Sequence, residues 1–235
     1  MSNKRRNKII HDKLPSKDDL IVDYTKDQLE EKMQASAMDI NLFSRNGYVH
    51  MSGVVDVLAE KYMAEKIAKN IEGVQKVENK ITVAMDSNIT DKHMEKEVIH
   101  KLRSNHNNDQ LLGVSVKVED GVANLIGSAN TLQDAHRAMS IASEVRGIKD
   151  VVNNIHISTA GRYDDAVLNS YVTQALSTTD LSYKDIAHSV TGGKLTLSGY
   201  VNSSYEMELA KEIAMGVEGI QKVISQLKIR KQRNQ

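Results

Sequence analysis

Nine of the thirteen glycines in this 235-residue chain belong to one repeated framework, which constrains the fold more than any other feature. Each copy has two glycines six residues apart and a third glycine twenty residues after the second, and the copies are 72–74 residues apart. The framework glycines are Gly47, Gly53, Gly73, Gly121, Gly127, Gly147, Gly193, Gly199 and Gly219. A repeat of this length predicts three tandem copies of one small domain.

Apolar residues alternate on both sides of the first glycine of each copy. In the second copy Val114, Val116 and Val118 precede this glycine, and Ala123 and Leu125 follow it. Alternation with a period of two indicates strands with one buried face. A glycine between two such runs indicates a tight turn, because glycine adopts a positive φ without steric cost. We therefore predict a β-hairpin in every copy.

A helical period follows the second glycine of each copy. Alanines recur eleven and fifteen residues after that glycine, with an isoleucine at fourteen. This spacing predicts an amphipathic helix of about sixteen residues whose small alanines lie close to the sheet. We interpret the third glycine as the C-cap of this helix. The alternating run behind it predicts a third strand, which a right-handed crossover connects to the hairpin.

A further helix precedes each hairpin. We interpret Thr25 with Gln28 as a capping box in the first copy, Thr90 as the cap in the second copy, and Asp164 or Asp165 as the cap in the third. The predicted fold class is therefore α+β, with three tandem α-β-β-α-β domains. In each domain two helices pack on a three-stranded mixed sheet.

The predicted organisation places the three domains between two basic tails. Residues 1–20 form a flexible basic tail, residues 21–86, 87–160 and 161–230 form the domains, and residues 231–235 form the second tail. A domain of about 65 residues buries only about 60% of its unfolded surface. We therefore expect the copies to pack on one another or on another chain, through open sheet faces and edge strands.

The composition argues against several classes of protein. Thirty-one basic residues balance 31 acidic ones, so the chain lacks the positive field that drives sequence-independent nucleic-acid binding, and no nucleic-acid partner is expected. The absence of cysteine excludes disulfide and thiolate chemistry. No apolar core of a signal peptide and no membrane span is visible. We expect a cytoplasmic location, with a periplasmic or envelope-associated location as the alternative.

The repeat resembles the BON domain, an α-β-β-α-β unit marked by a glycine-bounded hairpin, an A-x-x-I-A helix and a G-V-x-x-V-x-N turn. The hairpins here are Gly47–Gly53, Gly121–Gly127 and Gly193–Gly199, and the turns are Gly73–Asn79, Gly147–Asn153 and Gly219–Ser225. The resemblance covers nearly the whole chain after residue 20. It implies a non-enzymatic protein of the osmotic-shock or bacterial envelope type that binds phospholipid surfaces or small ligands. The motif residues are framework positions, so no binding residue carries over.

Three polar side chains on the first helix of the second copy are a weak metal-binding candidate. His93, Glu97 and His100 stand at i, i+4 and i+7, which can present three ligands on one helix face. The other copies lack these residues, and a solvated helix flank is the more ordinary interpretation. We therefore expect neither a metal nor a cofactor.

His188 is unusual because it takes the inward strand position that Leu42 and Val116 hold in the other copies. A hydrogen-bonded core histidine or a local register shift explains it better than a ligand does. No Ser/His/Asp or Cys/His set recurs at framework positions, so we expect no catalytic residues and no enzyme.

Basic residues gather at both ends of the chain, where each cation near an anionic lipid surface adds about 1 kcal/mol of attraction. The lipid-contact candidates are Lys4, Arg5, Arg6, Lys8, Lys228, Arg230, Lys231 and Arg233. Two hypotheses stay open. The first is a non-catalytic bacterial stress protein that engages anionic phospholipid membranes under osmotic or envelope stress. The second is a soluble oligomeric scaffold, or a small-ligand or ion-binding protein, with another protein or a second copy as its partner.

Overall fold

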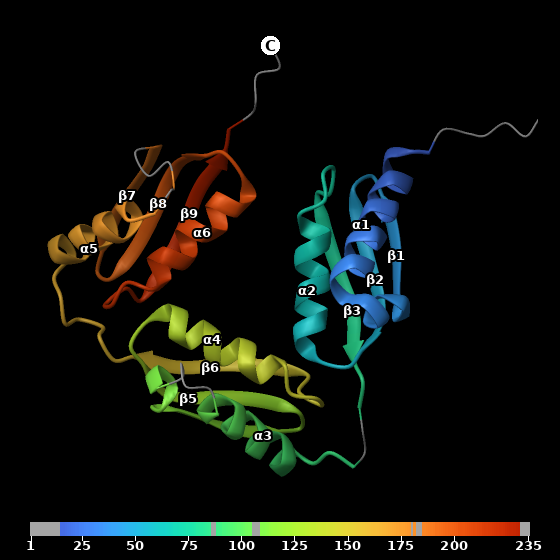
Figure 1. Ribbon diagram of the computed structural model, residues 1–235, viewed down its shortest axis with the longest axis horizontal. Helices are drawn as coiled ribbons and strands as arrows, with labels where there is room; N and C mark the ends of the chain where they lie inside the picture. Colours follow the sequence, from blue (N-terminus) through green and yellow to red (C-terminus); the bar gives the residue numbers. More distant parts are fainter. Residues whose placement is uncertain (1–14, 86–87, 105–108, 180, 182–184, 231–235) are drawn as a thin grey trace, which may run out of the picture. The chain divides into compact units, whose positions relative to one another are not determined.

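The computed structural model describes residues 15–85, 88–104, 109–179, 181 and 185–230, which form three α+β domains in tandem (Figure 1). The first domain makes up one compact unit, and the second and third domains make up another. Within the described residues every domain has two α-helices and one three-stranded mixed sheet. The predicted fold class is confirmed.

The elements follow the order α-β-β-α-β in each domain. The first domain consists of α1 (Lys17–Met33), the 3-10 helix η1 (Gln34–Asp39), β1 (Ile40–Arg45), β2 (Tyr48–Val55), α2 (Leu58–Lys69) and β3 (Lys76–Val83). The second consists of α3 (Asp91–Arg103), the 3-10 helix η2 (Asp109–Leu111), β4 (Val114–Glu119), β5 (Val122–Ala129), α4 (Leu132–Ser143) and β6 (Asp150–Ile157). The third consists of α5 (Asp165–Ser177), β7 (Ile186–Thr191), β8 (Lys194–Val201), α6 (Ser204–Met215) and β9 (Lys222–Ile229).

The second hairpin strand is the central strand of each sheet. In the second domain β5 pairs antiparallel with β4 and parallel with β6, and in the third domain β8 pairs in the same way with β7 and β9. Both helices of a domain lie on one face of its sheet (Figure 1). The alanines predicted to face the sheet are completely buried: Ala64, Ala68, Ala138, Ala142, Ala210 and Ala214.

The first two glycines of each copy have backbone conformations that favour glycine. The hairpin turns are Asn46-Gly47, Asp120-Gly121 and Gly192-Gly193, with a positive φ at both positions. This is the conformation of a type I′ turn, whose twist matches that of the flanking strands. Gly199 has φ +114°, and a Cβ atom there would lie 2.1 Å from the carbonyl oxygen of Asp185. The second glycine is equally crowded in the other two domains.

The first helix begins earlier in the sequence than predicted. Helix α1 starts at Lys17, so the prediction of a flexible tail over residues 1–20 was wrong for residues 17–20. Residues 1–14 lie outside the described residues. The caps predicted at Thr90 and Asp164 are confirmed, since each side chain accepts a hydrogen bond from a backbone N–H in the first turn of its helix.

The capping box of α1 is formed by Ser16 and Asp19, so the predicted box of Thr25 and Gln28 was wrong. The Ser16 hydroxyl accepts from the Asp19 backbone N–H, and the Asp19 carboxylate accepts from the Ser16 N–H. Thr25 is instead buried inside the helix, where its hydroxyl donates to the Ile21 carbonyl. A threonine can satisfy its hydroxyl in this way without ending a helix.

The second helix of each domain ends before the third glycine, so the prediction that this glycine is the helix C-cap was wrong. Each of these helices has twelve residues, and α4 ends at Ser143, four residues before Gly147. Gly147 has φ +90°, and a Cβ there would lie 2.8 Å from the Met94 sulfur. The third glycine therefore lets the turn after the second helix approach the first helix.

An aspartate in the first turn of each first helix binds the hairpin turn of its own domain. The Asp18 carboxylate accepts hydrogen bonds from the backbone N–H groups of Asn46 and Gly47 at 2.7 and 3.0 Å, and from the Ser44 hydroxyl at 2.6 Å. We call this contact the aspartate clamp. The equivalent residues in the second and third domains are Asp91 and Asp165, which also accept from both turn amides.

The clamp predicts a pH dependence of stability. Hydrogen bonds from the Gly47 amide, the Ser44 hydroxyl and the Asn46 amide lower the pKa of Asp18 below its usual value of 3.8. A folded-state pKa below the unfolded one gives stability that is fully present above the unfolded pKa and is lost as the pH falls through the folded pKa. We expect Asp18→Asn to lower the urea midpoint of the first domain at neutral pH. The difference from wild type should vanish well below pH 3.8.

Urea unfolding of the full chain at a series of pH values, followed by amide NMR signals of the first domain, measures this difference. Asp23→Asn is the matched control, because Asp23 is exposed on the same helix and makes no contact with the turn. It should leave the midpoint unchanged. A deficit of Asp18→Asn that stays the same size in acid would contradict the clamp as an ionic contact.

The asparagine that follows the third glycine in two domains is Ser225 in the third domain. Asn79 donates from its side-chain nitrogen to the Lys61 carbonyl of α2 at 3.0 Å, and its side-chain oxygen accepts from the Ile81 N–H at 3.1 Å. The Ser225 hydroxyl is buried and has no hydrogen-bond partner among the described residues. The shorter side chain therefore leaves a polar atom unsatisfied between β9 and α6.

Ser225→Asn should stabilise the third domain by about 1 kcal/mol, the usual net contribution of a hydrogen bond that also removes an unsatisfied group. The equivalent of Lys61 on α6 is Met207, whose carbonyl should accept from the new amide. Urea denaturation of the full chain measures the change. Ser225→Ala, which only removes the hydroxyl, should give a smaller gain, and an equal gain would count against the new hydrogen bond.

Candidate functional site

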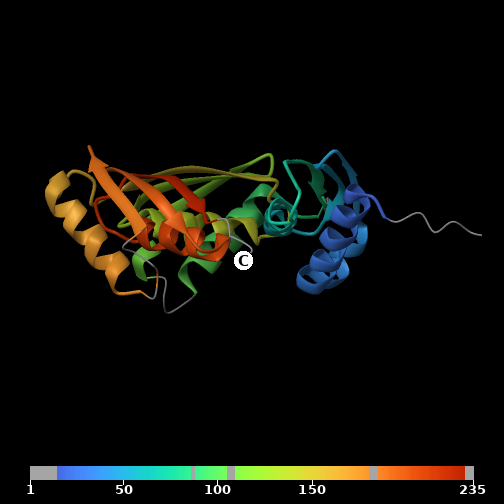
Figure 2. The ribbon, with the colours of Figure 1, turned by 90° about the horizontal axis from the view of Figure 1, so that it is seen from above.

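The three strands of the third sheet place three lysines and no acidic side chain on its open face. Side chains alternate across a strand, so the positions that do not point to the core form a face opposite the helices, and α5 and α6 lie on the other side (Figures 1 and 2). We call this surface the cationic sheet face. Its residues are Ala187, Ser189, Thr191, Lys194, Thr196, Ser198, Tyr200, Lys222, Ile224, Gln226 and Lys228.

Two of the lysines lie directly opposite each other on neighbouring strands. Lys194 of β8 is the register partner of Lys222 of β9, and Tyr200 is the partner of Lys228. Like charges in direct cross-strand pairs are destabilising, and an anion bound between them would relieve the repulsion. Tyr200 and Ile224 are exposed to 52% and 38% on the same face. The face thus combines positive charge with an aromatic and an aliphatic side chain.

The open faces of the other two sheets carry carboxylates, which outweigh the lysine of the second domain but offset only part of the charge of Arg45, Lys76 and Lys80 in the first. In the second domain Lys117 forms an ion pair with Glu119, and Asp150 begins β6 on the same face. In the first domain Glu78 lies 2.9 Å from Lys80 and 2.7 Å from His50, and these two side chains lower the pKa of Glu78. The third domain is therefore the one whose strands place three lysines and no carboxylate on the open face, and this face suits an anionic partner best.

The lipid-contact residues predicted from the sequence are only partly described by the structure. Lys228 is exposed on the cationic sheet face. Arg230 follows β9 and forms an ion pair with Asp185 at 2.7 Å, so its charge is already partnered. The other candidates lie outside the described residues, namely Lys4, Arg5, Arg6, Lys8, Lys231 and Arg233.

Sequence reasoning missed Lys194 and Lys222, although a signal for them exists. Lys194 directly follows a framework glycine and Lys222 lies three residues after another, so both positions fall on the polar half of an alternating strand. Taking the polar positions of all three strands together would have shown a face without carboxylates. Lys194 and Lys222 are isolated along the sequence, whereas the basic residues at its two ends are clustered.

The weak metal candidate is not assembled into a site. Across the described ranges, no group of three or more His, Cys, Asp or Glu side chains is arranged to hold a metal ion, so His93, Glu97 and His100 do not converge. The His93 Nδ1 atom lies 3.2 Å from the hydroxyl of the helix cap Thr90. The solvated helix flank describes these residues better than a set of ligands.

His188 is a hydrogen-bonded, half-buried histidine, and that interpretation is confirmed. Its register partner is Leu197, so the strand pairing shows no slip. The Nε2 atom lies 3.1 Å from the Thr173 hydroxyl and 3.3 Å from the Asn169 carbonyl oxygen. These partners on α5 satisfy the ring in the place that an aliphatic side chain fills in the second domain.

Among the described residues, no helix is long and apolar enough to span a membrane.

Three cavities of moderate size are lined by described residues. One cavity of about 320 Å³ lies between α1 and β1. A groove of about 480 Å³ runs between α1 and α2, where Met63, Ile67 and Lys66 line it. A third, of about 490 Å³, lies beside the end of α5 and the start of α6, with Tyr205 at its side.

A family model described as "BON domain" matches residues 17–85, 90–159 and 164–231, which together cover most of the chain. The chain belongs to the BON domain family. The resemblance seen in the glycine framework is thereby confirmed, and each matched segment contains one of the three α-β-β-α-β units. The cationic sheet face lies within the third BON domain.

The sequence identity between this BON protein and individual known proteins is low. It is 26% identical over 133 residues to osmotically-inducible protein Y of Escherichia coli (strain K12), and the match covers 52% of this chain and 65% of that protein. The chain therefore spans just under two thirds of this relative's length.

Two solved structures align over much of the chain with low scores. CdsD, a structural protein of the type III secretion system of Chlamydia trachomatis, is 14% identical, with 89% of this chain and 92% of that chain covered and a TM-score of 0.26. The periplasmic domain of PrgH, an inner membrane protein of the type III secretion system of S. typhimurium, is 12% identical, with 86% and 100% covered and a TM-score of 0.22.

Proposed function

We propose that this BON protein is a non-catalytic stress protein that binds anionic phospholipid surfaces through the cationic sheet face of its third domain. The observation that carries the proposal is the set of three exposed lysines, Lys194, Lys222 and Lys228, on strands that place no carboxylate on the same face. Each lysine near an anionic membrane contributes about 1 kcal/mol of attraction. The stress role is supported by the likeness to the osmotically-inducible protein Y.

The uncharged side chains of the face suit the boundary between headgroups and acyl chains. Tyrosine is enriched there because its ring is apolar and its hydroxyl is polar, and Tyr200 stands directly opposite Lys228. Ile224 adds exposed aliphatic surface in the row next to Lys222. Stable membrane association needs more than one weak signal, and charge combined with an interfacial aromatic residue supplies two.

Co-sedimentation of the full chain with vesicles tests the proposal. Vesicles of phosphatidylcholine should leave the protein in the supernatant, and vesicles that also contain phosphatidylglycerol should carry it into the pellet. Raising the salt from about 0.1 M to about 1 M shortens the Debye length from about 10 Å to about 3 Å and should release the protein. Sedimentation with neither vesicle would reject the proposal and favour the soluble scaffold hypothesis. Equal sedimentation with both vesicles would reject the cationic sheet face as the reason for binding.

A further inference from the structure

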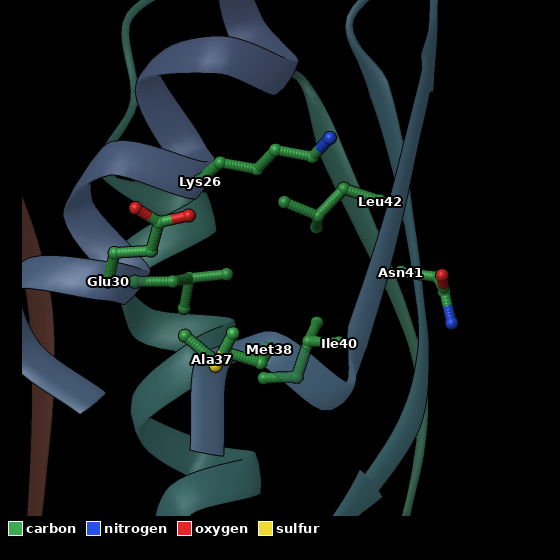
Figure 3. A pocket seen from close by; sticks show the side chains of 8 residues that line it. Lys26, Glu30, Ala37, Met38, Ile40, Asn41 and Leu42 are labelled. Atoms are coloured by element: carbon green, nitrogen blue, oxygen red, sulfur yellow. The ribbon is translucent and has the colours of Figure 1, made fainter. Parts of the chain in front are cut away.

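The cavity between α1 and β1 in the first domain has an apolar floor and two opposite charges at its mouth (Figure 3). Its volume is about 320 Å³. The side chains of Leu29, Ala37 and Ile40 are buried against it, while Lys26 and Glu30 are exposed beside it. Asn41 also borders the cavity, but its side chain points away (Figure 3).

The cavity exists because the first domain leaves unfilled a space that the other domains occupy. The position eight residues after the aspartate of the clamp is Ile99 in the second domain and Thr173 in the third. Ile99 packs against the core of its domain, which includes the buried Val116. Thr173 forms a hydrogen bond with His188 across the same space. The equivalent residue of the first domain is Lys26, whose side chain is exposed.

The charges at the mouth are complementary to a zwitterion. Lys26 and Glu30 lie one helical turn apart on α1, with their side chains on the same side of the helix. Within the described part of the chain, neither side chain forms an ion pair with another protein group. A cation and an anion beside a cavity with an apolar floor match a ligand with a carboxylate, an ammonium group and an aliphatic tail.

We propose that this cavity binds a free aliphatic amino acid of the size of leucine or methionine. The α-carboxylate faces Lys26, the α-ammonium group faces Glu30, and the side chain contacts Leu29, Ile40 and Leu42. The cavity volume corresponds to about ten waters at roughly 30 Å³ each, which is room enough for such a molecule. The site lies in the first domain, so this inference does not rest on membrane binding by the third.

Titration of the full chain with leucine, followed by saturation-transfer NMR and calorimetry, tests the site. A ligand this small in an open cavity should bind with a dissociation constant of about 1 mM. Leucinamide lacks the carboxylate, N-acetylleucine lacks the ammonium group, and glycine lacks the aliphatic tail. Each should bind at least about tenfold more weakly, the effect of losing one contact of about 1.4 kcal/mol. The proposal would be overturned if leucine did not bind, or if the three analogues bound as tightly as leucine.

Two substitutions locate the binding in this cavity. Lys26→Ile copies the residue of the second domain, should fill the space, and should abolish leucine binding. Glu30→Gln keeps the shape and removes the charge, and it should weaken binding about tenfold even if Lys26→Ile perturbs the fold. Lys32→Ile is the matched control, because Lys32 lies on the same helix but does not line this cavity. Leucine binding that survives both Lys26→Ile and Glu30→Gln would overturn the proposal.

Discussion

Alanine in place of Gly199 should destabilise the third domain by about 3 kcal/mol or more. The substitution combines two costs. Gly199 has φ +114°, a conformation that side-chain-bearing residues rarely adopt, and the new Cβ would lie 2.1 Å from the Asp185 carbonyl oxygen, which belongs to the backbone. A domain of this size has roughly 3–10 kcal/mol of stability at 0.05–0.15 kcal/mol per residue. The substitution should therefore remove from about a third to all of the stability of the third domain.

Limited proteolysis and amide NMR of the full chain report this loss for each domain separately. Cleavage should begin in the third domain, and the signals of the first domain, which belongs to a separate compact unit, should stay unchanged. Gly192→Asn is the matched control in the same domain: its φ is +57°, no atom lies within 4 Å of the new Cβ, and Asn46 holds this turn position at φ 53° in the first domain. It should keep full stability. A stable Gly199→Ala domain would refute the explanation of the glycine framework.

Replacing Lys194, Lys222 and Lys228 together by glutamine should weaken binding to anionic vesicles about a hundredfold. Each lysine near the surface contributes about 1 kcal/mol, so the three contribute about 3 kcal/mol, and 1.4 kcal/mol corresponds to a factor of ten. The fold should be retained, because the three side chains are exposed. Removal of the direct Lys194–Lys222 pair also relieves a cross-strand repulsion. Vesicle partitioning at a fixed low salt concentration measures the change.

A control triple variant separates a specific surface from net charge. Glutamine at Lys66, Lys92 and Lys96 removes the same total charge from exposed helix positions in the first and second domains. This variant should lose little binding if the cationic sheet face is the contact. If both triple variants lose binding equally, the attraction depends on overall charge, and the assignment to the third sheet is wrong.

The architecture could be predicted from the sequence because the same positions are constrained three times. Glycine at the turns and alanine on the second helix have backbone and packing reasons that act locally, and the structure places both as expected. The helix ends were harder to predict. Thr25 looked like a cap because threonine favours caps, but its hydroxyl bonds to the preceding turn of α1. Tertiary burial of that helix outweighs the local preference.

The two proposed binding surfaces could not be found by reading along the chain, because they depend on residues distant in sequence. Lys194 and Lys222 are neighbours only through parallel strand pairing across a helical connection. The cavity of the first domain lies where Lys26 does not fill the space between α1 and β1. This becomes visible only when Lys26 is compared with Ile99 and Thr173 in the folded domains. The sequence positions of Lys194 and Lys222, or of Lys26, do not by themselves indicate a shared surface or a cavity.

The aspartate clamp also bears on how each domain forms during synthesis. Asp18 contacts Asn46 and Gly47, so both sides of the contact have been made while the second helix and third strand are still untranslated. The first helix and the hairpin can therefore be held together as they leave the ribosome, before their sheet is complete. Since domains generally fold from the N-terminus as they emerge, three clamps in series give every domain an early native contact that does not require its neighbours.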